Sequence, residues 1–226
     1  MVELLDGNSP NAAVFRDSDG LATLISFCKF DDAKVRAGAL SLFEQLIIAG
    51  GNENDMTALL ELIHRFRDNY AIENEVIHSV IFCLRESHKS RTIFRKVGGF
   101  VHIVSVLVSL EGCLKKTQDP PFIACDTYRL LQSVFACLAV AMRYEPANAW
   151  HFQTEIAGGS SSKHFVETVR NLGCFDPSAD TIKTDLRESN SAAATAEAKK
   201  EAFAAIFHSR QPFSYKEYAA ASRSGH

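Results

Sequence analysis

The 226-residue chain has the composition of an ordinary folded protein, with 46% hydrophobic and 23% charged residues and a net charge of −3. No stretch reaches the roughly 18 uncharged apolar residues of a membrane-spanning helix, and the N-terminus has no signal-peptide pattern. Residues 1–75 hold 6 basic against 13 acidic side chains and residues 76–130 hold 8 against 4, an asymmetry that predicts a polarised surface but is too weak to predict nucleic-acid binding.

The first third of the chain predicts a series of amphipathic helices. Residues 9–29 favour short helices, and Asp31 or Asp32 can then cap a long one that a Gly-Gly pair ends. Apolar residues recur at helical spacing along this long helix. Its predicted stripe consists of Val35, Ala39, Leu42, Phe43, Leu46 and Ile47. Asp55 is the predicted cap of the next helix, which runs to residue 66.

The clearest repeat unit lies in residues 75–110, where a helix, a short capped helix, a Gly-Gly corner and a third helix follow one another. Ser87 or Ser90 can cap the short helix, and Gly98-Gly99 ends it. The predicted packing face of the third helix consists of Val101, Val104, Leu107 and Val108. This layout is typical of armadillo and HEAT repeats, whose units need stacked neighbours to bury their apolar faces.

The same layout recurs further along the chain. A nearly all-apolar helix begins at Asp126, a short helix ends at Gly158-Gly159, and a third helix follows. The two Gly-Gly pairs are 60 residues apart, longer than the roughly 40–47 of armadillo and HEAT repeats. Pro120-Pro121 marks residues 111–125 as the insertion responsible. We therefore predict an all-α fold, an armadillo/HEAT-like α-solenoid.

The sequence predicts three parts. Residues 1–175 form the helical repeats, with the inserted loop at about 111–125. Residues 176–192 are Ala- and Ser-rich and form a linker, and residues 193–226 form a C-terminal helix with a frayed tail. Because the N-terminus begins without a helix start signal, we expect a segment of a longer protein.

No catalytic or metal-binding motif is found. The six cysteines are scattered without a CxxC pair, and most fall among apolar residues, as core thiols in a reducing compartment do. His64, His78 and His102 lie beside core positions, which favours structural roles. HExxH and GxSxG are both absent. We predict a non-enzyme without catalytic residues, cofactor or metal, and an unrecognised hydrolase is the alternative.

The Gly-Gly pairs are interpreted as turns, because neither GxGxxG nor GxxxxGK[ST] occurs. Glycine adopts positive φ and has no Cβ, which suits a sharp corner between closely packed helices. The predicted structural turns are Gly98, Gly99, Gly158 and Gly159.

The best candidate for binding is a basic cluster, which consists of Arg85, Lys89, Arg91, Arg95 and Lys96. These cations can converge on an acidic peptide, a phosphoinositide headgroup or a phosphorylated partner. The alternative is a solvated helix face with local pairs such as Glu86–Lys89. Nucleic acid is not predicted, because no aromatic stacking platform accompanies the cluster.

Trp150 and Phe152 admit two interpretations. They could be an exposed anchor for a peptide, since they lie in a short segment between Pro146 and Gly158. Their position matches Ile93-Phe94 of the first copy, which favours a place in the core.

Residues 86–112 resemble the N-terminal armadillo-like region of very large BEACH–WD40 proteins, most closely their autophagy-linked FYVE branch. The match is carried by Arg91, Phe94, Arg95, Lys96, Val97, Gly98, Gly99 and Phe100. The resemblance implies a cytosolic scaffold for selective autophagy that brings protein aggregates to autophagic membranes. The 226 residues given show no FYVE zinc motif and are too few to include the BEACH, PH-like and WD40 modules. The resemblance therefore does not imply the functions of those modules.

Two functional hypotheses follow. The first is a noncatalytic scaffold segment of a BEACH-family protein, which acts in selective autophagy or membrane trafficking. Its partners are other proteins or adjacent repeats of the parent chain, and its location is cytoplasmic. The alternative is a membrane-surface module that binds phosphoinositides through the basic patch, peripheral to autophagic or endosomal membranes.

Overall fold

The computed structural model describes residues 8–114, 125–157 and 162–173, and every regular element in these ranges is a helix. The sequence predictions for the linker, the C-terminal helix, Gly158 and Gly159 lie outside the described residues. Within those ranges no single helix has both the length and the apolar character needed to cross a membrane. In the same ranges, one pair of helices, α7 (His88–Lys96) and α8 (Gly99–Ser109), has sufficient length and apolar character when the two are taken together, and a bend of 71° separates them.

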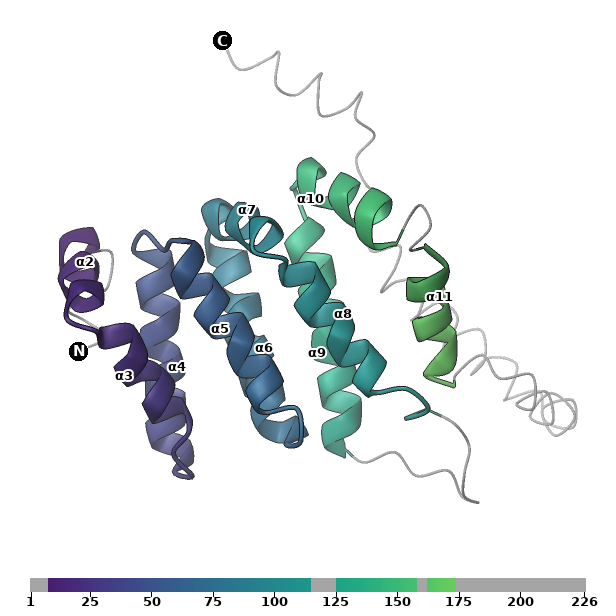
Figure 1. Ribbon diagram of the computed structural model, residues 1–226, viewed down its shortest axis with the longest axis horizontal. Coiled ribbons are helices and arrows are strands. Elements are labelled where there is room, and N and C mark those ends of the chain that lie inside the picture. The colour runs from purple at the N-terminus through teal and green to yellow at the C-terminus, as the bar shows by residue number, and fades with distance from the viewer. Residues whose placement is uncertain (1–7, 115–124, 158–161, 174–226) are drawn as a thin grey trace, which may run out of the picture. The chain divides into compact units, whose positions relative to one another are not determined.

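The helices stack in two layers, as predicted for an all-α solenoid (Figure 1). One layer consists of α4 (Ala33–Ile48), α6 (Tyr70–Glu86) and α9 (Cys125–Met142), packed side by side in chain order. The other consists of α3 (Gly20–Cys28), α5 (Glu53–Arg65), α8 and α11 (Ser162–Asn171). Shorter elements complete the stack, namely α2 (Ser9–Asp17), α7, α10 (Pro146–His151) and a π-helix, η1 (Phe152–Ile156).

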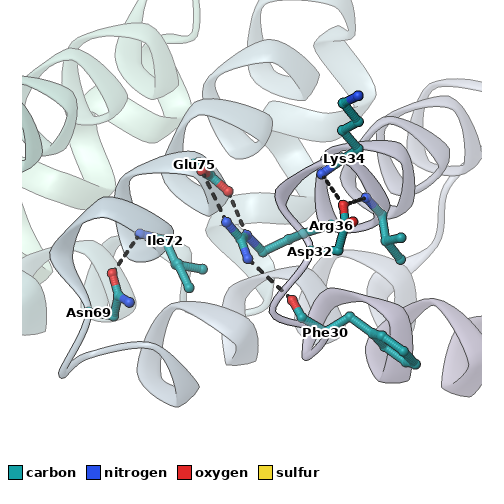
Figure 2. Close-up of polar contacts among 8 residues, drawn as sticks. Phe30, Asp32, Lys34, Arg36, Asn69, Ile72 and Glu75 are labelled. Carbon is teal, nitrogen blue, oxygen red and sulfur yellow. Dashed lines mark hydrogen bonds and ion pairs between the residues drawn. The ribbon is translucent and has the colours of Figure 1, made fainter.

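Side-chain caps start several of these helices. Asp32 caps α4, with Oδ1 accepting the backbone N–H of Lys34 at 2.7 Å (Figure 2). Ser87 caps α7. The predicted cap of α5 is wrong: Asn52 is the cap and Asp55 lies three residues later, where each side chain accepts a hydrogen bond from the backbone N–H of the other residue. A capping box of this kind satisfies two free N–H groups at once.

The apolar faces of the helices form one core. On α4 the predicted stripe is largely buried, but Val35 is exposed because it lies in the first turn beside the exposed cap. On α8 the predicted face is rotated. The buried residues of that helix are Gly99, Phe100, Ile103, Val106 and Leu107, whereas Val101 and Val108 are more than half exposed. Successive helical positions turn by about 100°, so a one-residue error in the assigned face exposes its edge.

Polar ties join successive units at a constant spacing in the first part of the chain. Arg16 of α2 contacts Asp55 of α5 at 2.8 Å, 39 residues later. Arg36 of α4 contacts Glu75 of α6 at 2.7 Å, also 39 residues later (Figure 2). The spacing is close to the armadillo and HEAT period of about 40, so these arginines mark the repeat.

The ties that join helices before α8 to helices after it are longer. Arg95 of α7 reaches Asn148 of α10 over 53 residues, and His78 of α6 reaches Ser133 of α9 over 55. The difference from 39 is 14–16 residues, close to the length of residues 111–125. Most of those residues lie outside the described part of the chain, so the insertion itself stays a prediction.

In the Gly98-Gly99 corner, each glycine is required for a different structural reason. Gly98 has φ of 75° in the left-handed region, and a Cβ there would meet no atom within 4 Å. A Cβ on Gly99 would lie 2.4 Å from the ring of Phe94. The first glycine therefore provides a backbone conformation and the second provides space for a buried ring.

Candidate protein-interaction surface

Two members of the predicted basic cluster hold the fold together. Arg91 donates from Nη1 to the carbonyl oxygen of Leu84 at 2.6 Å, which satisfies a free carbonyl near the end of α6. Arg95 donates from Nε to Oδ1 of Asn148 at 3.0 Å. Both side chains are half-buried. The five cations therefore do not converge on one site: the geometry assigns Arg91 and Arg95 to packing between helices.

Asn148 is the partner that sequence reasoning missed. Its side chain is completely buried, and its Nδ2 donates to the carbonyl oxygens of Ala141 at 2.8 Å and Arg91 at 2.9 Å. With the bond from Arg95, one amide joins α7, α9 and α10. All its bonding groups are used, as a buried polar side chain requires. In the sequence Asn148 is a single asparagine inside a short helix. Such residues are common, so the local sequence does not indicate that this one is buried and hydrogen-bonded.

The other three cations are on the surface. Lys96 lies 3.9 Å from Glu53, and both side chains are more than half exposed, so the pair adds little stability. Arg85 and Lys89 are exposed, and neither forms an ion pair with another described residue. The expected Glu86–Lys89 pair is likewise not seen in the described ranges. Arg85 and Lys89 remain available to a partner.

Next to these cations, the turn from α9 to α10 is unusual. Tyr144 has φ of 57°, a left-handed conformation that is costly for a bulky residue. Tyr144 is 61% exposed, and the guanidinium of Arg143 lies 5.0 Å from the centroid of its ring. Residues held in such conformations often serve a function. Here the strained turn displays an aromatic ring with a cation beside it.

Trp150 and Phe152 take opposite positions, so the expectation that both belong to the core is wrong for Trp150. Trp150 is 62% exposed. Phe152 packs inward, with its ring centroid 5.4 Å from Phe100 and 5.2 Å from Phe165. Two residues apart on a helix differ by about 200°, so only one of the pair can face the core.

We name as the corner surface five of the exposed side chains of this region, the three cations and the two aromatic residues that are not half-buried; Glu86 and His88 are exposed beside them. They come from the last turn of α6, the first turn of α7, the α9–α10 turn and α10, and α7 packs against both α9 and α10. The members are Arg85, Lys89, Arg143, Tyr144 and Trp150. Trp, Tyr and Arg are the residue types enriched among the strongest contributors to protein interfaces.

A second surface feature is an apolar groove of about 320 Å³ between α8 and η1. Its lining residues are Val101, Val104, Ser105, Val108, Glu155 and Ile156. The groove explains why the predicted packing face of α8 is partly exposed.

Three of the cysteines lack the environment of a nucleophile. Burial raises the pKa of Cys28 to about 11 and raises the pKa of Cys83 and of Cys137 still further. A thiol must ionise to attack, so these three act as core residues, as predicted. Cys113 is half-buried and Cys125 is exposed, and Cys174 lies outside the described residues. Among the described side chains, no group of three or more His, Cys, Asp or Glu residues could hold a metal.

Curated relatives match most of this chain. The human WD repeat- and FYVE domain-containing protein 4 is 28% identical over 183 residues, which cover 77% of this chain. The mouse protein of the same name is 27% identical over the same length. In both cases the match spans only 5% of the relative. They are proteins of the kind that the resemblance predicted, whereas the narrower likeness to the autophagy-linked FYVE branch stays a prediction. No solved structure matches.

The family model for armadillo-like repeats matches residues 66–196, more than half of the chain. This range includes α6 to α11, which contain the Gly98-Gly99 corner, the long ties and the corner surface. The chain therefore belongs to the family of armadillo-like repeats.

Proposed function

We infer that the chain is a noncatalytic scaffold segment that binds other proteins within a large BEACH-family protein, and that this scaffold acts in selective autophagy or membrane trafficking. The observation that carries the scaffold role is the armadillo-like family match over a two-layer helical stack. Such arrays present long surfaces for partners. The names of the relatives, which contain WD repeats and a FYVE domain, support a place in a multi-module protein.

The corner surface is the part of the scaffold best suited to a partner protein. Arg85, Lys89 and Arg143 supply positive charge, and Tyr144 and Trp150 supply large exposed rings. Charge of one sign speeds encounter with an oppositely charged partner, and aromatic rings supply most of the contact energy. A protein segment that combines acidic and apolar side chains fits this chemistry.

The test is a pull-down with matched charge reversals. One variant carries Arg85→Glu and Lys89→Glu on the corner surface, and the control carries Lys29→Glu and Lys34→Glu, two exposed cations of the α3–α4 region. We expect the first variant to lose partners that the wild type and the control retain. Equal recovery by all three proteins would remove the corner surface from the proposal. Arg91 and Arg95 are left intact, because changing them would disturb the fold.

The role in autophagy needs a cellular test. Cells without the protein would be complemented with the wild type, with the Arg85→Glu/Lys89→Glu variant or with the Lys29→Glu/Lys34→Glu control, and clearance of an aggregated reporter would be followed. We expect the corner variant alone to clear the reporter slowly, and the protein to be cytoplasmic. Equal clearance in cells with and without the protein would refute the role in autophagy while leaving the scaffold role intact.

The membrane-surface alternative has less support. With Arg91 and Arg95 committed to internal bonds, the exposed cations of the basic cluster are Arg85, Lys89 and Lys96. At about 1 kcal/mol per cation near an anionic leaflet, three of them give weak attachment. Co-sedimentation with vesicles of phosphatidylserine and phosphoinositide, repeated at high salt, would decide whether this binding occurs.

A further inference from the structure

Two histidines far apart in the sequence meet between neighbouring helices. His64 lies in the last turn of α5, and His102 lies in the first turns of α8. Their Nε2 and Nδ1 atoms are 2.8 Å apart, and their ring centroids are 4.8 Å apart at an interplanar angle of 41°. Figure 1 shows α5 and α8 side by side in the same layer. The pair therefore bridges two successive units of the stack.

This pair is accessible to a small ion. His64 is exposed and His102 is half-buried. Glu61, one turn before His64 on the same helix, is exposed and acts on His102 through its charge. A carboxylate next to two imidazoles raises the local concentration of cations.

We propose that His64 and His102 form a binding site for a divalent transition-metal ion that prefers nitrogen ligands, Cu²⁺ or Ni²⁺. Imidazole suits both ions, and both accept square-planar or tetragonal coordination. Water molecules would complete the coordination, because the described residues offer no set of three protein ligands. The site would clamp α5 to α8.

The distance between the two nitrogens decides which ions fit. Two metal–nitrogen bonds of 2.0–2.1 Å at right angles place the nitrogens about 2.8–3.0 Å apart. The observed separation of 2.8 Å is at the lower end of this range. Tetrahedral Zn²⁺ would require about 3.3–3.4 Å from the same bond lengths, so the helices or rings would have to move apart. Cu²⁺ and Ni²⁺ therefore fit better than Zn²⁺.

The protons balance without a co-reactant. In the metal-free pair one ring donates an N–H and the other accepts it. In the complex His64 binds through Nε2 and carries its proton on Nδ1, while His102 binds through Nδ1 and carries its proton on Nε2. The ring that donates in the metal-free pair moves its proton from the metal-binding nitrogen to its other nitrogen through solvent water, so no net proton is released. Burial, and then the charge of His64, lower the pKa of His102.

The experiment uses the untagged full chain. Ni²⁺ titration calorimetry measures stoichiometry and affinity, and the electron paramagnetic resonance spectrum of bound Cu²⁺ reports its nitrogen ligands. The variants are His64→Gln and His102→Gln, and the control is His78→Gln, which removes another helical histidine with a polar partner, Ser133. Circular dichroism checks that each variant is folded.

We expect one equivalent of Ni²⁺ to bind the wild type and the control, with at least tenfold weaker binding in either pair variant. The Cu²⁺ spectrum should show two nitrogen ligands in the wild type and fewer in the pair variants. At 100 times the dissociation constant, Ni²⁺ should raise the melting temperature by about 5–11 °C. Unchanged binding in a folded His64→Gln protein, or a Cu²⁺ spectrum without two nitrogens, would overturn the proposal.

Discussion

The two halves of the described stack use the same helical layout at two different chain spacings. In the first half, Arg16–Asp55 and Arg36–Glu75 each span 39 residues. In the second half, the Arg95–Asn148 tie spans 53. The packing of α6 on α9 nevertheless continues the layer that α4 and α6 begin. The spatial repeat therefore survives a change in the sequence repeat.

Loop-closure entropy explains why the change is tolerated. The cost of closing a loop grows only with the logarithm of its length, so lengthening the span from 39 to 55 residues costs about 0.3 kcal/mol. The buried contacts of one helix are worth far more than this. The two halves instead differ in how their helices are held together. Arginine–carboxylate pairs do this in the first half, whereas aromatic rings and the amide of Asn148 do it in the second.

The largest effect should come from Phe100 of α8, whose ring packs against rings of α7 and η1. Its centroid lies 5.2 Å from Phe94 and 5.4 Å from Phe152, and the side chain is completely buried. Phe100→Ala should lower the free energy of unfolding by about 3–5 kcal/mol, because it removes a large buried ring and leaves a cavity. Urea denaturation measures this. A loss below about 1 kcal/mol would mean that this ring does not hold α7, α8 and η1 together.

Asn148 should have the next largest effect, and Trp150 in the same helix provides the control. Asn148→Ala leaves two buried carbonyl groups and Arg95 without their partner, which should cost about 2–3 kcal/mol. Trp150→Ala, at an exposed position, should change stability by no more than about 0.5 kcal/mol. Similar losses for the two variants in chemical denaturation would contradict the role of the Asn148 amide in joining α7, α9 and α10.

The arginine ties of the first half can be compared with each other. Arg16→Ala leaves the carboxylate of Asp55, 1% exposed, without its cation, and we expect a loss of about 2 kcal/mol. Arg36→Ala leaves Glu75, whose side chain is 42% exposed and can turn to water, so about 1 kcal/mol is expected. Thermal unfolding of both variants tests this order, and the reverse order would show that burial of the carboxylate does not set the cost.

A further effect, comparable to that of Arg36→Ala, comes from Glu73 of α6 and depends on pH. Glu73 of α6 is buried, and desolvation raises its pKa to about 7, against the attraction of Arg67. The folded state thus holds a proton that the unfolded state loses above about 4.5, so stability contributed by this group falls as pH rises from about 4.5 to 7. In contrast to α6, the neighbouring helix α9 buries a serine, Ser133, and the hydroxyl of serine does not titrate between pH 4.5 and 8.

Glu73→Gln should therefore stabilise the protein by roughly 1–2 kcal/mol at pH 8 and have little effect at pH 4.5. Denaturation curves of both proteins at the two pH values provide the measurement. Equal effects at both would show that Glu73 is not protonated in the folded state at low pH.

Much of the fold could be predicted from the sequence, because helix periodicity and glycine corners are local signals. Asp32 and Ser87 follow the capping rules. The cap of α5 was misplaced because both Asn52 and Asp55 are cap-forming residues, and in a capping box either can be read as the cap. The face of α8 was misassigned because nearly every residue of that helix is apolar, so periodicity alone does not identify its buried side.

The candidate site was much less predictable, because it depends on long-range contacts. Five nearby cations suggested convergence, but whether a particular arginine faces water depends on residues as distant as Asn148, 53 positions from Arg95. Trp150 and Phe152 differ only by helical phase, which a π-helix beginning at Phe152 makes hard to predict. The His64–His102 pair likewise lies 38 residues apart, without a local motif.

The segment after α8 makes two backbone bonds with the end of the last described helix. The N–H of Gly112 donates to the carbonyl of Asn171 and the N–H of Leu114 to that of Leu172, both at 2.7 Å. These two amides are sheltered from solvent exchange only while α11 is docked. Their hydrogen-exchange rates therefore report the opening of this end of the stack, separately from unfolding of the helices before it.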